Sequence, residues 1–178
     1  MPSPRELFQK AFATALEKKY EDAKLFYRET LALDPEYSMA WSNLGWILYD
    51  QDQNYTEAEE CYTKAVKFDK NNFHAWNNWG ILFYRFHKNY REAERCWKKS
   101  SKIYPDFARV WNNLGVLYKF QLKKPKKSKQ CFARAEALAK VEVKIIKSMQ
   151  AQSTKCTECG NTLVPNQQIC DVCGSAKT

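Results

Sequence analysis

Three ten-residue stretches of the chain are near copies of one another: AWSNLGWILY at residues 40–49, AWNNWGILFY at 75–84 and VWNNLGVLYK at 110–119. Each stretch begins 35 residues after the previous one. Self-similarity at a fixed period of about 20–50 residues is the signature of a repeat architecture, in which each unit buries its apolar face against its neighbours. The chain is therefore predicted to be a solenoid of stacked units.

The recurring residues resemble the tetratricopeptide (TPR) family, whose helix-turn-helix unit of about 34 residues carries the pattern W-x2-L-G-x2-Y, then A-x3-F, A and P. The second unit places this pattern on Trp41, Leu44, Gly45, Ala58, Tyr62 and Ala65. The third and fourth units follow with Trp76, Gly80, Ala93, Trp97 and Pro105, and with Trp111, Leu114, Gly115, Phe132 and Ala135. The first unit is clear only in its second helix, at Tyr20, Ala23 and Tyr27.

The resemblance implies an all-α fold, a TPR solenoid with repeats at about 4–37, 38–72, 73–107 and 108–141. One extra residue in the turn within repeats two to four explains the period of 35. Apolar residues continue at helical spacing after Ala135, which predicts that the last helix extends or that a short capping helix follows. We assign the four repeats and a capping helix to one domain, 1–150, and a linker to 151–155.

Two C-x-x-C pairs lie in the last segment, 156–178, and ten residues separate them: Cys156 with Cys159, and Cys170 with Cys173. Four thiolates at this spacing can complete a tetrahedral zinc shell, which is similar to that of a short zinc ribbon. A closed four-cysteine shell leaves no position for water, so the expected zinc is structural and not catalytic. The alternative is a pair of redox thiols or disulfides. Cys61, Cys96 and Cys131 are too far apart for a shared metal site and are expected to pack in the core.

In the TPR fold the first helix of each repeat lines a concave groove. Counting Trp41, Trp76 and Trp111 as fourth positions places a column of carboxamides at the sixth, which suits an extended peptide because an amide both donates to and accepts from a peptide backbone. An asparagine that is merely common in the consensus is the alternative explanation. The expected groove residues are Gln9, Asn43, Asn78, Asn113, Asn77, Asn112, His74, Arg109, Trp46, Tyr49 and Tyr84. Phe8 and Phe12 stand where a carboxylate clamp for chaperone tails needs a basic residue and an asparagine, so such a ligand is disfavoured.

The charge of the chain is concentrated in its second half. Residues 85–147 carry 18 Lys or Arg against 5 Asp or Glu, whereas 1–84 carry 9 against 13. A basic run in this part could contact phosphate or an acidic protein, although a solvated loop is the simpler explanation. Its members are Lys123, Lys124, Lys126, Lys127 and Lys129.

These features predict a non-enzymatic adaptor that binds a protein or peptide partner in its groove. The alternative is an RNA- or ribosome-associated factor that uses the basic region and the ribbon. The sequence has only two histidines and no phosphate-binding loop or nucleophile elbow, which disfavours an enzyme. The N-terminus lacks the apolar region of a signal peptide, and no stretch reaches the roughly 18 apolar residues of a membrane span, so we expect a cytoplasmic monomer.

Overall fold

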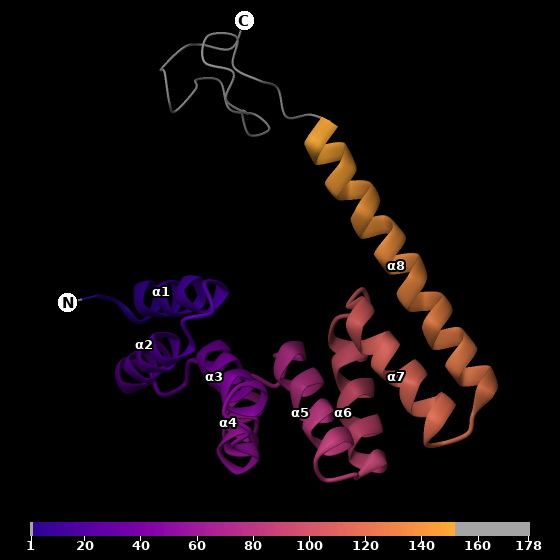
Figure 1. Cartoon of the computed structure of the whole chain (residues 1–178), viewed down its shortest axis with the longest axis horizontal. Helices are drawn as coiled ribbons and strands as arrows, with labels where there is room; N and C mark the ends of the chain where they lie inside the picture. The colour runs from indigo at the N-terminus through magenta and orange to yellow at the C-terminus, as the bar shows by residue number, and fades with distance from the viewer. Residues whose placement is uncertain (1, 152–178) are drawn as a thin grey trace, which may run out of the picture. The chain divides into compact units, whose positions relative to one another are not determined.

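The computed structural model describes residues 2–151, in which the chain forms eight α-helices and no strand (Figure 1). The helices form consecutive helix-turn-helix pairs: α1 (Pro4–Leu16) with α2 (Tyr20–Leu33), α3 (Ser38–Asp50) with α4 (Tyr55–Phe68), α5 (Phe73–Arg85) with α6 (Tyr90–Ile103), and α7 (Ala108–Phe120) with α8 (Pro125–Ala151). The chain divides into two compact units, residues 1–135 and 136–178. The first unit holds all the residues of the four predicted repeats except the end of the last, and the description below concerns this unit.

The turn inside each repeat has one conserved geometry. Lys18, Gln53, Lys88 and Lys123 lie 35 residues apart, and each has a positive φ between 50° and 62°. This left-handed residue stands two positions before the second helix begins and helps to reverse the chain. The turn is three residues long in the first repeat and four in the others, 17–19 against 51–54, 86–89 and 121–124. The extra residue predicted for repeats two to four is therefore present in these turns.

Each repeat is held together where its two helices approach most closely. A Cβ atom added to Gly80 would lie 2.6 Å from the indole Nε1 of Trp97, and one added to Gly115 would lie 2.7 Å from the Phe132 ring. Any side chain at these positions would push the two helices apart. The glycine of the repeat pattern is thus required by the aromatic residue of the second helix.

The tryptophan at the fourth position fixes the turn between repeats. The indole N–H of Trp41 donates to the Pro35 carbonyl at 2.7 Å, and Trp76 and Trp111 donate to the carbonyls of Lys70 and Pro105. In all three cases the acceptor lies six residues earlier, in the turn that precedes the first helix. The buried or half-buried indole is thereby satisfied, and the turn is tied to the helix.

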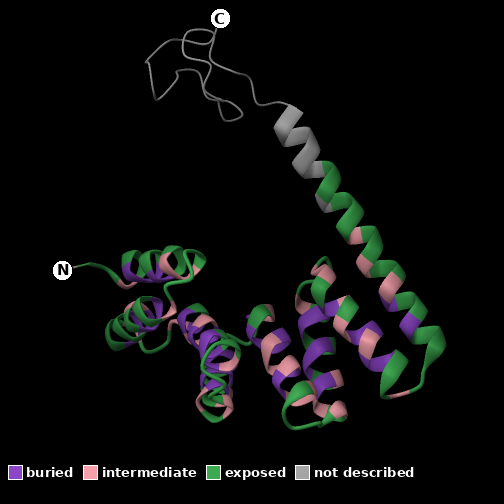
Figure 2. Cartoon of the chain, in the orientation of Figure 1, coloured by how far each residue is buried: buried purple, intermediate pink, exposed green. Residues whose placement is uncertain are grey.

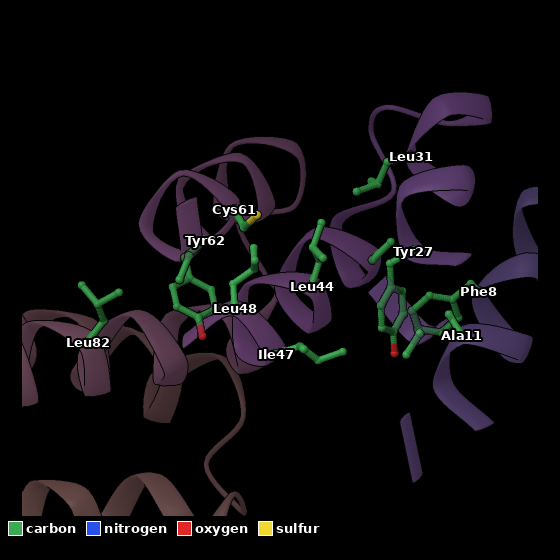
Figure 3. Close-up of a cluster of buried hydrophobic side chains, with 13 residues drawn as sticks. Phe8, Ala11, Tyr27, Leu31, Leu44, Ile47, Leu48, Cys61, Tyr62 and Leu82 are labelled. Carbon is green, nitrogen blue, oxygen red and sulfur yellow. The ribbon is translucent and has the colours of Figure 1, made fainter. Parts of the chain in front are cut away.

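The core runs continuously through neighbouring repeats. One cluster of buried side chains extends from Phe8 on α1 to Leu82 on α5, with Tyr27 and Tyr62 among its largest members (Figures 2 and 3). Ala23, Ala58 and Ala93 are fully buried at equivalent places on the second helices. Because the small residues recur with the repeat, each unit packs on the next in the same way.

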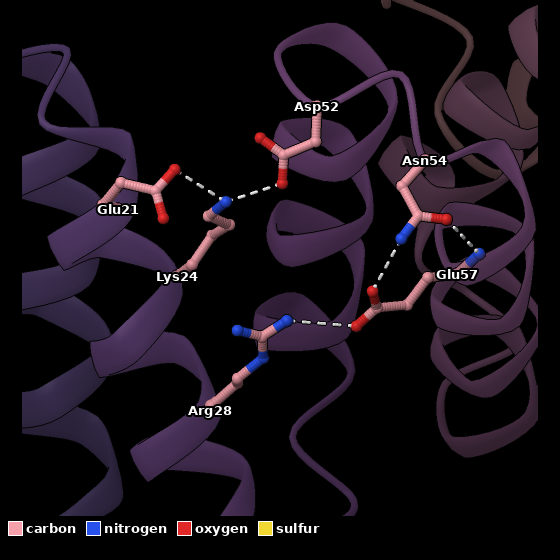
Figure 4. Close-up of polar contacts among 6 residues, drawn as sticks. All are labelled: Glu21, Lys24, Arg28, Asp52, Asn54 and Glu57. Atoms are coloured by element: carbon pink, nitrogen blue, oxygen red, sulfur yellow. Dashed lines mark hydrogen bonds and ion pairs between the residues drawn. The ribbon is translucent and has the colours of Figure 1, made fainter.

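Polar contacts also join the first two repeats (Figure 4). Lys24 on α2 is buried to 8% exposure, and its ammonium lies 2.6 Å from the Asp52 carboxylate and 2.8 Å from that of Glu21. Arg28 reaches Glu57 on α4 at 3.2 Å. These contacts lock the turn of repeat two onto the second helix of repeat one.

The last helix continues further than a separate capping helix would allow. The apolar spacing after Ala135 was compatible with a separate capping helix, but α8 is a single helix of 27 residues to Ala151. No glycine or proline interrupts residues 126–151, so nothing ends the helix earlier. Of the linker predicted at 151–155, Ala151 is the last residue of α8, and 152–155 and the four ribbon cysteines lie outside the described residues.

Candidate functional site

Four residues of each first helix share one face because they lie at i, i+4, i+7 and i+11. They occupy the second, sixth, ninth and thirteenth positions of the repeat, and we call the surface that they form the groove face. From repeat one to repeat four these stripes are Arg5, Gln9, Phe12 and Leu16; Met39, Asn43, Trp46 and Asp50; His74, Asn78, Ile81 and Arg85; and Arg109, Asn113, Val116 and Phe120.

A hollow of about 140 Å³ lies on this face, between α3 and α5. It is lined by Trp46, Tyr49 and Asp50 of α3, by Tyr62 of α4, and by Asn78, Ile81 and Arg85 of α5. Pockets for whole small molecules measure roughly 300–1,000 Å³. This hollow therefore suits one side chain or a short piece of backbone and not a metabolite-sized ligand.

The sixth-position asparagines of repeats two to four are each held at one end by the protein. Asn43 donates its amide to the Tyr27 hydroxyl at 3.1 Å, and Asn113 donates to the Asn77 carboxamide oxygen at 2.9 Å. Asn78 instead accepts, from the Asn77 amide at 3.1 Å. Within the described residues, the oxygens of Asn43 and Asn113 and the amide of Asn78 have no hydrogen-bond partner. The row consequently offers acceptor, donor and acceptor in successive repeats.

Tyr62 lines the hollow, but its hydroxyl is fully buried and has no hydrogen-bond partner among residues 2–151. Its counterpart in repeat one, Tyr27, accepts from Asn43, and its counterpart in repeat three, Trp97, donates to the Asn77 carbonyl. Burial raises the pKa of Tyr62 well above its ordinary value, so the hydroxyl keeps its proton. An unpaired buried hydroxyl costs about 1–3 kcal/mol. The hollow is thus the one place in these three repeats where this hydrogen bond is missing.

Two of the expected groove residues, Asn77 and Asn112, lie at the fifth position of their repeats and not on the groove face. Asn77 is only 1% exposed and sits in the core, where it bonds to Asn78 and Asn113. Ser42, its counterpart in repeat two, is equally buried. The fifth position faces the first helix of the following repeat, so Asn77 joins α5 to α7 and does not line the groove. Asn112 occupies the same position in repeat four and is exposed.

The remaining expected residues lie on or beside the groove face. Trp46 is 37% exposed, Arg109 is exposed, and Tyr49 and Tyr84 are half-buried. His74 is exposed at its edge, but its ring packs against Phe73 and Phe107 with centroids 4.1 and 5.2 Å away. Burial and the nearby Arg109 guanidinium hold the pKa of His74 below its ordinary value, so the ring is neutral at pH 7.

Sequence reasoning missed Asp50 and Arg85 as lining residues of the hollow, and it missed Tyr62. Spacing could have revealed the first two, because Asp50 and Arg85 stand 11 residues after Met39 and His74 on the same helical stripe. Tyr62 gave no such signal, since it is the large aromatic of the repeat pattern.

The three repeated cysteines are core residues, as expected. Cys61, Cys96 and Cys131 are 2%, 0% and 7% exposed. Burial raises the pKa of Cys61 and Cys96 to about 12, which removes the reactive thiolate at neutral pH. Within the described part of the chain, no three cysteine, histidine or carboxylate side chains are grouped as metal ligands would be.

The five lysines of the basic run are exposed, at the turn after α7 and in the first turns of α8. Lys127 stands where α2, α4 and α6 carry Asp22, Glu57 and Glu92. The helix dipole favours an acidic residue there. Repeat four therefore carries the opposite charge at this position, and that charge destabilises the start of α8.

The repeated turns, the close glycine contacts and the row of first helices all match one known unit, and two family models described as a tetratricopeptide repeat match residues 17–73 and 108–141. The chain is built of tetratricopeptide repeats. The second match begins at the residue where α7 begins and covers the fourth repeat.

Solved structures support the TPR fold. A Pseudomonas aeruginosa PilF structure superposes with a TM-score of 0.68 at 29% identity. The match covers 76% of this chain and 60% of the PilF chain. A MamA crystal structure gives a TM-score of 0.65 at 17% identity, covering 79% of this chain and 81% of that one. A MamA RS-1 ArsTM double mutant gives a TM-score of 0.63 at 19% identity, covering 78% of this chain and 76% of that one. No curated protein sequence matches the chain.

One further finding concerns membranes. Of the helices described here, none combines the length and the apolar character that crossing a bilayer requires.

Proposed function

We propose that the protein is a non-enzymatic interaction scaffold that binds an extended peptide segment of a partner protein on its groove face. The observation that carries this proposal is the row of Asn43, Asn78 and Asn113, whose carboxamides are each fixed at one end by the protein and unpaired at the other within the described residues. An extended peptide has alternating N–H and C=O groups, which such a row can bind without selecting a side chain.

The spacing of the first helices sets the length of the ligand. Packed helices lie about 8–10 Å apart, and an extended chain advances about 3.3 Å per residue. Each repeat therefore accommodates about three ligand residues, and four repeats accommodate roughly nine to twelve. A peptide of about 12 residues is the natural probe.

The test is a selection of random displayed 12-residue peptides on the full-length protein, followed by fluorescence-anisotropy titration of an enriched peptide. We expect the triple variant Asn43→Ala, Asn78→Ala and Asn113→Ala to keep its helical circular-dichroism spectrum and to bind about tenfold more weakly or worse, because each lost hydrogen bond contributes about 0.5–1.5 kcal/mol. The matched control is Asn71→Ala with Gln130→Ala, which removes two exposed amides away from the groove face. Unchanged affinity in the triple variant would contradict the proposal.

We also propose that Cys156, Cys159, Cys170 and Cys173 bind one structural zinc ion, on the strength of their spacing and the glycine after each pair. About 23 residues bury too little apolar surface to fold alone, so the metal would supply most of the stability of this segment. Metal analysis of the purified protein should give one zinc per chain. The double variant Cys156→Ser with Cys159→Ser should lose it, whereas Cys61→Ser should retain it.

The second candidate function is nucleic-acid or ribosome association through the basic run. The observation that favours it is Lys127, which replaces the acidic residue of the other second helices and brings five exposed lysines together. A pull-down from lysate with and without ribonuclease separates the two functions. Loss of all recovered material after ribonuclease treatment would favour this candidate over the peptide scaffold.

A further inference from the structure

The charged residues of the groove face are almost all basic. Arg5, Arg85 and Arg109 lie on the stripes defined above, and Lys119 lies one position before the end of the fourth stripe. Asp50 is the only acidic residue among these stripes. It lies in the same hollow as Arg85 and accepts a hydrogen bond from Gln51 at 2.6 Å.

The four cations of the groove face have no acidic partner, whereas some cations of the second helices do. Lys24, Arg28, Arg95 and Lys98 on the second helices all form ion pairs with carboxylates, as does Arg134 on α8. Among residues 2–135, Arg5, Arg85, Arg109 and Lys119 have no carboxylate within ion-pair distance. Lys64, Arg91, Lys99 and Lys102 on the second helices are likewise in no ion pair among these residues, so it is their place beside the carboxamide row that makes the four groove cations candidates for a ligand contact.

The groove face also changes character along the solenoid. Repeats one and two expose apolar side chains, with Phe12 at 49%, Leu16 at 70% and Met39 at 54%. Arg5 is the single cation beside them, whereas repeats three and four present Arg85, Arg109 and Lys119 together with one exposed apolar side chain, Phe120 at 51%. An apolar surface of this kind is uncommon outside interaction sites, and the basic half attracts a ligand of opposite charge.

We infer that the ligand is an acidic peptide, with aspartate or glutamate residues over repeats three and four and a large apolar side chain over repeats one and two. This inference rests on the proposed function, since it assigns a chemical class to the ligand of the same groove. Asp50 partly offsets Arg85, so the strongest attraction for a carboxylate lies at Arg109 and Lys119. The carboxamide row holds the backbone, and the two ends of the groove set the direction of the peptide.

The end of the chain itself does not match this description. Residues 152–178 contain Lys155, Lys177, Glu158 and Asp171 and are therefore neutral. A separate acidic segment has the better complementarity, and the inferred occupant is a partner protein.

The experiment is the same peptide selection, read for the net charge of the enriched peptides and repeated at low and at physiological salt. Acidic peptides should dominate, and an enriched peptide should bind Arg109→Gln with Lys119→Gln about 5- to 20-fold more weakly, since each exposed charge pair contributes modestly. The matched control is Lys99→Gln with Lys102→Gln, which removes the same charge from the exposed face of α6. It should change affinity less than twofold. Arg109→Gln alone provides a milder variant, and thermal unfolding of all variants checks the fold.

Three results would overturn the inference. Enrichment of neutral or basic peptides would leave the peptide scaffold standing and exclude the acidic class. Equal weakening of peptide binding by the groove and α6 double variants would show that the overall positive charge attracts the ligand. Displacement of the peptide by a uridine oligonucleotide would show the same if the α6 variant no longer binds that oligonucleotide. Failure to enrich any peptide would instead exclude the proposed function and this inference together.

Discussion

At the scale of single residues, the groove depends on contacts that leave almost no free space. The Gly80 Cα faces the indole of Trp97, whose N–H donates to the Asn77 carbonyl at 3.0 Å. Asn77 in turn bonds to Asn78 and Asn113. A change at Gly80 therefore reaches the carboxamide row through two intermediate residues.

Gly80→Ala should destabilise the protein by about 1–3 kcal/mol, because the new methyl group would lie 2.6 Å from Trp97 Nε1 and the ring has no free space to move into. In an exposed helix the same change would stabilise by about 0.5–1 kcal/mol, so overpacking must exceed this gain. Urea unfolding followed by circular dichroism measures the difference. Asn112→Ala, at an exposed position of α7, serves as the control with an effect within about 0.5 kcal/mol.

The neutral state of His74 predicts a pH dependence. Because burial and Arg109 lower its pKa in the folded protein, the unfolded chain binds the proton first as pH falls below about 6.5. The contribution of His74 is complete above this pH and is lost as pH falls toward the lowered pKa. The stability of the wild type relative to His74→Gln should thus decrease between pH 7.5 and 5.5. A constant difference across this range would show that His74 does not titrate as expected.

At the scale of secondary structure, the second helices of repeats two and three begin with an asparagine cap that the first and last repeats lack. The Asn54 and Asn89 side chains accept from the backbone N–H groups of Glu57 and Glu92, at 3.2 Å each. Lys19 and Lys124 occupy the same place in repeats one and four. The middle repeats therefore have the better-defined helix starts, and they are the repeats that form the hollow.

Asn89→Ala should lower stability by about 1 kcal/mol, because an unpaired N–H group is left at the start of α6. Asn89→Asp should retain most of the wild-type stability, since aspartate is an equally good cap. Thermal unfolding of the two variants side by side distinguishes loss of the cap from a general effect of mutation. If both variants lost the same stability, the cap would not be the cause.

At the scale of the whole solenoid, each repeat is stabilised mainly by its neighbours. The first repeat has only one, and Lys24 and Arg28 connect it to repeat two through Asp52 and Glu57 (Figure 4). Loss of these ion pairs should therefore destabilise α1 and α2 and leave the later helices unchanged.

Asp52→Ala should increase hydrogen exchange in α1 and α2 and leave α5 and α6 unchanged, because the Lys24 ammonium keeps only the exposed Glu21 as a partner. Glu29→Ala, an exposed residue of α2 without an ion pair, is the control and should change neither pair of helices. Equal loss of protection in all helices would mean that the solenoid opens as a single cooperative unit.

The sequence by itself determined the repeat period, the helix pairs and the core. Trp41, Gly45, Ala58 and their counterparts recur every 35 residues because each repeat must present the same packing surface to the next, and that requirement appears directly as periodicity. The extra turn residue and the burial of Cys61, Cys96 and Cys131 followed from the same spacing. The sixth-position carboxamides could also be located by counting.

Only the tertiary structure decided how these carboxamides are used. Asn77 and Asn78 are adjacent in sequence, yet one is buried against α7 and the other lines the hollow, because a helix turns by about 100° per residue. Tyr27 and Tyr62 occupy the same repeat position, yet only Tyr27 has a hydrogen-bond partner. Such differences depend on the rotamers of neighbouring side chains in three dimensions, and no one-dimensional pattern records them.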